Sequence, residues 1–338
     1  MTTIKTVAEY CGVSVSTVSR ALNDHPDVSN EAKAKVKAAA KKLHYVPNSS
    51  ARDLVRTKSD SIGVVVRGAD NTFFVPIVGA IGESCERAGY DMVLRQASAR
   101  ADEIKEGAEL VNSKRLKGLV LLGGRYDYAR EDAVSIGVPF VCCSFTNQFG
   151  NLEKDAYSSV SIDDCASAYE ATKSLIAKGH RKIAVLLDSV HDHSISELRF
   201  MGYCQALEDS GLPVDQELIC ETVDFTMEAA YEATAELLGR RPDVTAVFSV
   251  ADSMAIAAMK ALYEFGRKVP EDCSVIAIDG IESSLYTTPT LTTLSQPQET
   301  LGEEAVRILV DVLEGRAQSS HIRLNTTLRP GGTVGMAR

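Results

Sequence analysis

The chain has 338 residues, of which 45% are hydrophobic and 24% charged, a composition typical of soluble globular proteins. This length exceeds one ordinary hydrophobic core, so we expect two or three domains. No apolar run reaches the roughly 18 residues that suggest a membrane span, and no apolar signal-peptide core follows the N-terminus, so we expect a cytoplasmic protein without a membrane partner.

Charge is unevenly distributed along the chain. Residues 1–60 hold ten basic and six acidic side chains, a net charge of +4, whereas the whole chain carries −10, so residues 61–338 carry −14. A small basic head on an acidic body indicates that only the head meets nucleic-acid phosphates. The eight cysteines form no CxxC pair and lie at no metal-ligand spacing from a histidine, so we expect reduced core thiols and no metal site.

The first predicted element is a short amphipathic helix, because apolar residues at 4, 7, 8 and 11 follow the spacing of one helix face. Gly12 can end this helix, and Ser14 can cap a second one. The inner face of the second helix is Val18, Ala21 and Leu22, and its outer face is Val15, Ser16, Ser19 and Arg20. Two short helices joined by a glycine-bearing turn, the second with a small, hydroxylated and basic outer face, describe a helix-turn-helix.

Residues 29–43 predict a third helix, with Ser29 as its cap and lysines along one face. Pro47 prevents a simple continuation of that helix. Asn48 can cap a further short segment before the polar residues 57–60. The sequence therefore predicts an all-α head that ends near residue 60.

From Ser61 onward, β-branched runs alternate with helical stretches. Nine runs predict strands, at 61–66, 90–96, 118–124, 139–145, 159–163, 182–188, 218–223, 245–250 and 273–279. This alternation indicates parallel sheets covered by helices on both faces. Nine strands favour two doubly wound lobes that join near Ile162, with a ligand cleft between the carboxyl ends of their strands. No phosphate-binding glycine motif, HExxH or GxSxG is found, so we expect neither enzyme chemistry nor a cofactor.

Successive motifs make nearly the whole chain resemble the lactose-repressor/galactose-repressor (LacI/GalR) family. They are TIKTVAEYCGVSVSTVSRALN, VSNEAKAKV, LHYVPNSSARDL, SIGVVV, DNTFF, KGHRKIAVL, RFMGYCQAL, ADSMAIAAM, VIAIDG and PTLTTLSQP. The resemblance implies a bacterial transcription regulator, expected to be a repressor, that works as a homodimer. It also implies a two-lobed α/β effector-binding core resembling periplasmic binding proteins. The expected parts are a headpiece at 1–46, a hinge helix and linker at 47–60, a first lobe at 61–161 with 292–321, and a second lobe at 162–291 with 322–338.

The resemblance places Val15, Ser16 and Arg20 on the face that enters the DNA major groove. Arg20 can donate two parallel hydrogen bonds to a guanine edge. Leu54 inherits the role of a hinge leucine that wedges into the minor groove, whereas Asp53 stands where the family commonly carries a small or uncharged residue. The predicted contacts to double-stranded DNA, on a pseudo-palindromic operator, are Thr6, Val15, Ser16, Thr17, Ser19, Arg20, Asn23, Ser29, Tyr45, Asn48, Ala51, Arg52 and Leu54.

The resemblance also places effector contacts in the cleft. Arg199 resembles an arginine that grips ligand oxygens in many members, and Asp279 ends a predicted strand at the cleft. Ala251 stands where Asn, Ser or Thr is common, which argues against lactose-like recognition. Asp252 either binds ligand or caps the following helix. The predicted effector-binding residues are Asn71, Phe73, Phe74, His193, Arg199, Phe225, Asp252 and Asp279.

Several functions remain open at this point. A sugar is the first expected small-molecule effector and a purine or nucleoside the second, while a phosphorylated carrier protein is a third possible controller. A cytosolic solute-binding sensor without a DNA role fits the lobes alone, but the basic head argues against it. The salt dependence of DNA binding separates the sensor from the regulator, since phosphate contacts make affinity fall log-linearly with salt.

Overall fold

The computed structural model describes residues 3–22, 24–43, 45, 60–68, 71–222 and 224–338. The chain forms two compact units, Met1–Lys58 and Ser59–Arg338. The predicted hinge segment, including Asn48, Ala51, Arg52, Asp53 and Leu54, lies outside the described residues, as does Asn23.

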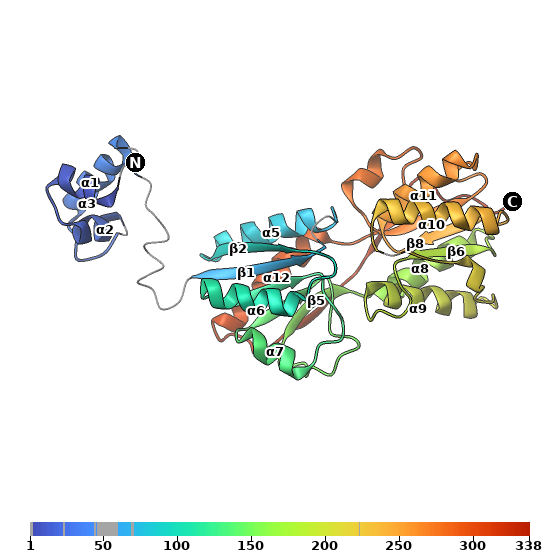
Figure 1. Ribbon diagram of the computed structural model, residues 1–338, viewed down its shortest axis with the longest axis horizontal. Coiled ribbons are helices and arrows are strands. Elements are labelled where there is room, and N and C mark those ends of the chain that lie inside the picture. The colour runs from blue at the N-terminus through green and yellow to red at the C-terminus, as the bar shows by residue number, and fades with distance from the viewer. Residues whose placement is uncertain (1–2, 23, 44, 46–59, 69–70, 223) are drawn as a thin grey trace. The chain divides into compact units, whose positions relative to one another are not determined.

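The first unit contains the three predicted helices, α1 (Ile4–Cys11), α2 (Val15–Leu22) and α3 (Asn30–Lys42) (Figure 1). Gly12 ends α1 with a φ of 67°, in the left-handed region that favours glycine. The Ser14 hydroxyl caps α2 by accepting the backbone N–H of Thr17 at 3.1 Å. The predicted apolar faces meet in one small core that includes Val7, Ala8, Cys11, Val18, Ala21, Val36 and Ala39.

The second unit contains two six-stranded sheets, and the first of them is parallel throughout, in the order β11-β5-β4-β3-β1-β2. Its strands are β1 (Ser61–Arg67), β2 (Asp91–Ala97), β3 (Gly118–Leu122), β4 (Phe140–Cys143), β5 (Ser158–Ile162) and β11 (His321–Leu324). Helices α5 (Phe74–Arg87) and α12 (Gln298–Leu313) pack on one face, and α6 (Glu103–Lys114) and α7 (Arg130–Ile136) on the other. Successive residues of β1 point to opposite faces, so Val64 joins the first of these cores and Val65 the second.

The second sheet has the order β12-β10-β9-β8-β6-β7. Its strands are β6 (Ile183–Leu187), β7 (Ile219–Glu221), β8 (Ala246–Ser249), β9 (Ser274–Asp279), β10 (Thr292–Ser295) and β12 (Thr327–Arg329). Figure 1 shows α8 (Asp164–Ala177) and α9 (Ile195–Glu208) on one side of this sheet, and α10 (Met227–Arg240) and α11 (Asp252–Glu264) on the other. Two 3-10 turns, η1 (Gln216–Leu218) and η2 (Glu282–Tyr286), precede β7 and follow β9. All nine predicted strands are present, and the antiparallel pairing of β12 with β10 was not predicted.

The chain passes between the two lobes three times. It leaves the first lobe after β5, which ends at Ile162 as predicted, and it returns between β10 and α12. The final crossing lies between β11 and β12. The sequence assigned 292–321 to the first lobe and 322–338 to the second. Both limits were wrong by one strand, because β10 belongs to the second sheet and β11 runs to Leu324 in the first.

Candidate functional site

A cavity of about 280 Å³ lies between the two lobes, where the carboxyl ends of strands from both sheets meet. Arg67 ends β1 and Asp279 ends β9, and both line the cavity. Six of the eight residues predicted to bind an effector line it, namely Asn71, Phe73, Phe74, Arg199, Phe225 and Asp279.

Arg199 is the most buried charged side chain of this cavity, with 1% of its surface exposed. Its Nε donates to Oδ1 of Asp164 at 2.9 Å, and its Nη1 lies 3.5 Å from Oδ1 of Asp279. Nη1 also donates to the carbonyl of Val250, the residue that follows β8. Arg199 is therefore fixed between two buried carboxylates, and its Nη2 lies 2.9 Å from Asp164. These contacts hold the guanidinium in a fixed orientation.

Asp279 has an unusual protonation equilibrium. Its side chain accepts a hydrogen bond from the amide of Gln296 at 2.9 Å and is only 4% exposed. Burial raises the pKa of Asp279 to about 7, while the guanidinium of Arg199 opposes the shift. A strongly perturbed carboxyl in a cleft is typical of a binding site, because burial has been accepted there at a cost in stability.

The two adjacent phenylalanines have different roles in the wall. Phe73 is 4% exposed and belongs to the core beneath α5 and α12, whereas Phe74 is half-buried. Their ring centroids lie 5.5 Å apart in an edge-to-face arrangement. The side-chain oxygen of Asn71 accepts the backbone N–H of Phe73 at 3.0 Å, so Asn71 fixes the turn that leads into α5. Phe74 thus offers the more accessible aromatic surface.

His193 and Asp252 do not line the cavity. The imidazole of His193 is half exposed, packs on Phe149 and lies 3.3 Å from the carboxylate of Glu197. Its carbonyl accepts the backbone N–H of Tyr126 at 3.2 Å, a hydrogen bond between the two lobes. Asp252 is the first residue of α11 but makes no capping bond there; its carboxylate is buried behind the wall.

Sequence patterns missed a set of polar residues that line the cavity, namely Arg67 at the end of β1 and, from loops, Arg100, Tyr126, Asp188, Asp192 and Asp224. The two basic ones belong to the first lobe and the three acidic ones to the second. Burial raises the pKa of Asp188 to about 6. Behind Arg67 lies the fully buried carboxylate of Glu103, whose Oε2 is 3.4 Å from the Arg67 Nε. No local periodicity marks these residues, since the packing of the two lobes brings them together.

The residues of α2 that were predicted to face DNA are exposed in the structure. Val15, Ser16, Ser19 and Arg20 are all exposed on the side away from Val18 and Ala21. The Ser16 hydroxyl lies 2.8 Å from that of Ser14, and the Thr17 hydroxyl is equally close to Ser14, so both are oriented by the cap. Three other residues predicted to contact DNA also have a structural role in the headpiece. Thr6 completes the capping box of α1, Ser29 caps α3, and Tyr45 packs on the headpiece core.

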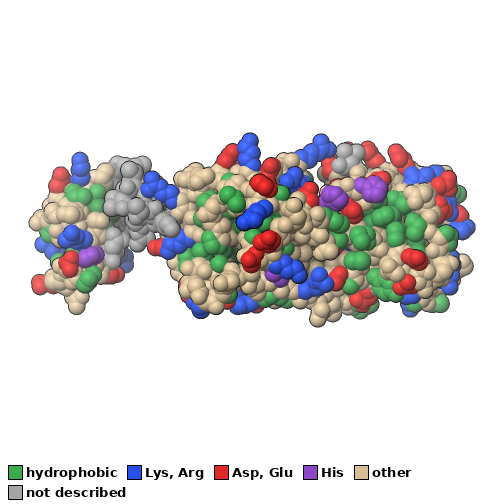
Figure 2. Space-filling view, turned by 90° about the horizontal axis from the view of Figure 1, so that it is seen from below, with side chains coloured by type: hydrophobic (Ala, Val, Ile, Leu, Met, Phe, Trp, Pro, Cys, Tyr) green, Lys and Arg blue, Asp and Glu red, His purple; other side chains and the backbone are tan. Residues whose placement is uncertain are grey.

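The surface of the core carries charged side chains of both signs. Figure 2 shows acidic and basic side chains intermixed over one face of the core, with no broad patch of a single sign. Some of the acidic side chains of residues 61–338 form salt bridges, such as Glu304 and Asp311 with Arg307. The face seen in Figure 2 therefore gives DNA phosphates no extended basic patch to bind.

Comparison with known proteins agrees with both halves of the structure. Residues 3–48 match the bacterial regulatory proteins of the lacI family, and residues 172–334 match the periplasmic binding protein-like domain. The chain is 37% identical over 327 residues to the HTH-type transcriptional regulator MalR of Clostridium butyricum, which covers 96% of this chain and 97% of that protein.

Two solved structures extend the similarity to the fold. A complex of the transcriptional regulator CelR with cellobiose is 31% identical, with a TM-score of 0.72, and covers 98% of this chain and 100% of that one. A lac repressor dimer bound to operator and the anti-inducer ONPF is 27% identical, with a TM-score of 0.80 and 99% coverage of each chain.

A helix-turn-helix followed by a two-lobed core with a cleft defines a DNA-binding transcriptional regulator with an effector-binding domain. The chain belongs to the lacI family of bacterial regulatory proteins.

Proposed function

We propose that the protein represses transcription by binding a pseudo-palindromic operator, and that a small neutral saccharide held between its lobes controls this binding. The observation that carries the proposal is the interlobe cavity, which is lined by the paired Arg199 and Asp279 and by the aromatic ring of Phe74. A ligand that binds one state of the core more tightly than another would couple the cavity to operator binding by about 1–3 kcal/mol.

The polarity of the cavity favours a saccharide. Ionised carboxylates only accept hydrogen bonds and guanidinium groups only donate them, so their combination suits hydroxyl groups, which do both. Four aspartates and three arginines line the cavity, which leaves no excess positive charge for a phosphate ester. Phe74 offers an apolar face against which a sugar ring can pack. That CelR was solved with cellobiose supports the same ligand class.

A thermal-shift panel tests the ligand class. We expect a saccharide from a panel of cellobiose, maltose and ribose to raise the Tm, since a ligand at 100 times its Kd stabilises the folded state by about 2.7 kcal/mol. Phe225→Ala removes a cavity-lining ring and should reduce that shift, whereas Met227→Ala, an exposed residue outside the lining, should not. A shift with hypoxanthine or guanine alone would favour the purine class, and no shift with any small molecule would contradict the site.

The DNA-binding residues are proposed from their placement on α2. Arg20→Ala should weaken binding to the selected operator by about 1–3 kcal/mol and relax the preference at one base pair, because a bidentate contact to guanine is lost. Lys35→Ala, which removes an exposed basic side chain of α3, is the control and should weaken operator and random duplex alike. Fluorescence anisotropy with both duplexes measures this. Equal losses on the two duplexes for Arg20→Ala would show that Arg20 reads no base.

We further propose a homodimer in the cytoplasm. Two headpieces would then contact half-sites about one helical turn apart. The lac repressor neighbour was solved as a dimer on its operator. Within the described ranges, no helix has the length and hydrophobicity to cross a membrane.

A further inference from the structure

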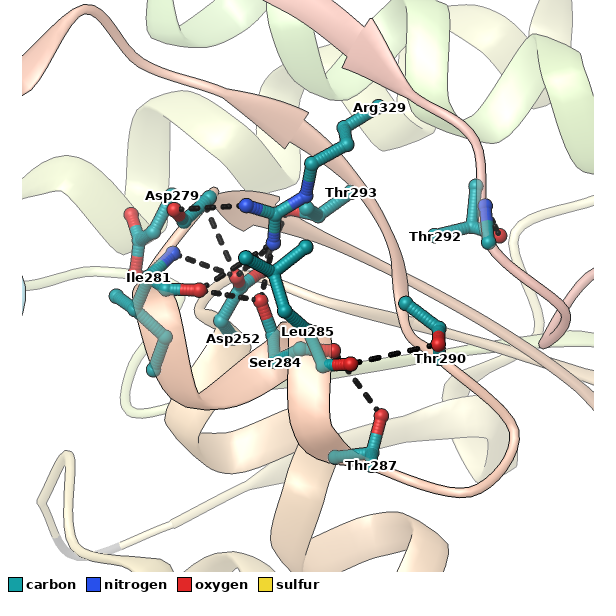
Figure 3. A network of polar contacts seen from close by, with 12 residues as sticks. Asp252, Asp279, Ile281, Ser284, Leu285, Thr287, Thr290, Thr292, Thr293 and Arg329 are labelled. Carbon is teal, nitrogen blue, oxygen red and sulfur yellow. Dashed lines mark hydrogen bonds and ion pairs between the residues drawn. The ribbon is translucent and has the colours of Figure 1, made fainter.

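The carboxylate of Asp252 is buried behind the cavity wall, and both of its oxygens accept hydrogen bonds there (Figure 3). Its Oδ2 accepts the backbone N–H groups of Gly280 and Ile281, each at 3.0 Å. Its Oδ1 accepts the hydroxyl of Thr293, on β10, at 2.5 Å. Asp252 therefore ties the start of α11 to the turn that follows β9 and to the next strand of the sheet.

Arg329, on β12, holds the same turn by its carbonyl groups (Figure 3). Its Nη1 donates to the carbonyl of Gly280 at 3.1 Å and its Nη2 to that of Ile281 at 3.3 Å. Nη2 also donates to the hydroxyl of Ser284, which in turn donates to the Ile281 carbonyl at 2.6 Å. Asp252 thus binds the N–H groups of Gly280 and Ile281, and Arg329 binds their carbonyl groups. The Arg329 Nη2 and the Asp252 Oδ2 lie 3.9 Å apart.

The residue just before this turn is Asp279, whose backbone is strained. Its φ of 140° lies in a region that residues with a side chain rarely adopt. Gly280 follows with a φ of 79°, and a side chain there would collide with the hydroxyl of Ser295. Strained conformations of this kind persist only where surrounding contacts fix them, and they cluster at ligand sites.

We propose that Asp252 and Arg329 are positioning residues, which hold the turn at 280–281 and thereby keep the carboxylate of Asp279 at the cavity wall to receive the effector. The inference rests on the proposed binding of an effector in this cavity. It also gives Asp252 a role in place of direct ligand contact. The two bonds to consecutive N–H groups restrain the backbone adjacent to Asp279, so loss of Asp252 loosens the backbone that carries the Asp279 side chain.

Three variants test the proposal. Asp252→Ala removes the acceptor for both N–H groups. Asp252→Asn keeps an oxygen for them and presents its amide to Thr293, so it should preserve the turn. Asp272→Ala is the matched control, because Asp272 accepts a backbone N–H, that of Lys268, at the opposite end of β9. Hydrogen exchange followed by mass spectrometry reports on the peptide that spans 279–286, and calorimetric titration with cellobiose and maltose reports on affinity.

We expect Asp252→Ala to accelerate exchange at 280–281 and to weaken saccharide affinity by about tenfold, the size of one lost hydrogen bond to a charged group. Asp252→Asn should restore both to near the wild-type values, and Asp272→Ala should change neither. Unchanged exchange in Asp252→Ala would overturn the proposal, as would faster exchange with unchanged affinity. If the wild type binds neither sugar, the saccharide assignment fails, and carboxyl footprinting of Asp279 then decides the positioning role, since labelling in Asp252→Ala equal to that of the wild type would overturn it.

Discussion

Arg199→Met is expected to lower the free energy of unfolding of the core by about 3–5 kcal/mol, because removing one partner leaves buried charges uncompensated. Asp164 and Asp279 flank the guanidinium and are 5% and 4% exposed. Methionine fills a similar volume, so little of the loss would come from a cavity. The deficit should grow as pH rises, since burial already raises the pKa of Asp164 and both carboxyls would ionise without a counter-charge.

Urea unfolding followed by circular dichroism measures this effect, at pH 5 and pH 8. The control is Arg181→Met, which removes an exposed arginine of the same lobe and should cost less than about 1 kcal/mol. A deficit in Arg199→Met no larger than that of the control, or one that shrinks at pH 8, would mean that Arg199 does not neutralise the two carboxylates.

Asp279→Asn is expected to stabilise the core above neutral pH by about 2–4 kcal/mol, which follows from the pKa of Asp279 at about 7 against an ordinary value of 3.8. A raised pKa in the folded state favours the protonated form there. In the wild type the folded state keeps its proton between about pH 4 and 7 while the unfolded state has lost it. Wild-type stability therefore falls over that interval, and the uncharged variant escapes the fall.

The pH dependence of Tm for both proteins checks this prediction. The difference between variant and wild type should be smallest near pH 4, widen up to about pH 7 and then level off. Asp224→Asn supplies the control of opposite sign, because a hydrogen bond with Thr226 lowers the pKa of Asp224. Its charge stabilises the fold at neutral pH and loses that effect as pH falls. Parallel curves for Asp279→Asn and the wild type would show that Asp279 titrates normally.

The headpiece could be predicted almost completely, because its signals are local. Gly12, the cap at Ser14 and the apolar stripe through Val7 and Val18 each determine one feature of the three-helix unit, and the structure confirms all of them. The nine main strands were equally predictable from their β-branched runs. Strands β10, β11 and β12 were not, because their sequences, TTLS, HIRL and TLR, contain polar residues and no continuous apolar run.

The cavity could be predicted only in part, since its residues meet through tertiary folding. Arg199 and Asp279 were found from their motifs, but nothing local shows that Arg199 is also the counter-ion of Asp164. Asp252 has the same sequence signature whether it binds a ligand, caps a helix or anchors a turn. Only the positions of the Gly280 and Ile281 N–H groups identify the third role. Arg67 lines the cavity only because both lobes pack around it, and no sequence pattern predicts that position.

Operator affinity measured with and without saccharide tests the central claim most directly. A duplex selected by the protein from a random library is labelled, and its Kd is determined by fluorescence anisotropy at fixed salt, with the sugar that raises the Tm present at saturation. Ligand control predicts a change of at least roughly fivefold in Kd for the selected duplex, the lower end of ordinary allosteric coupling, with little change for random DNA. The same Kd with and without bound sugar would contradict it.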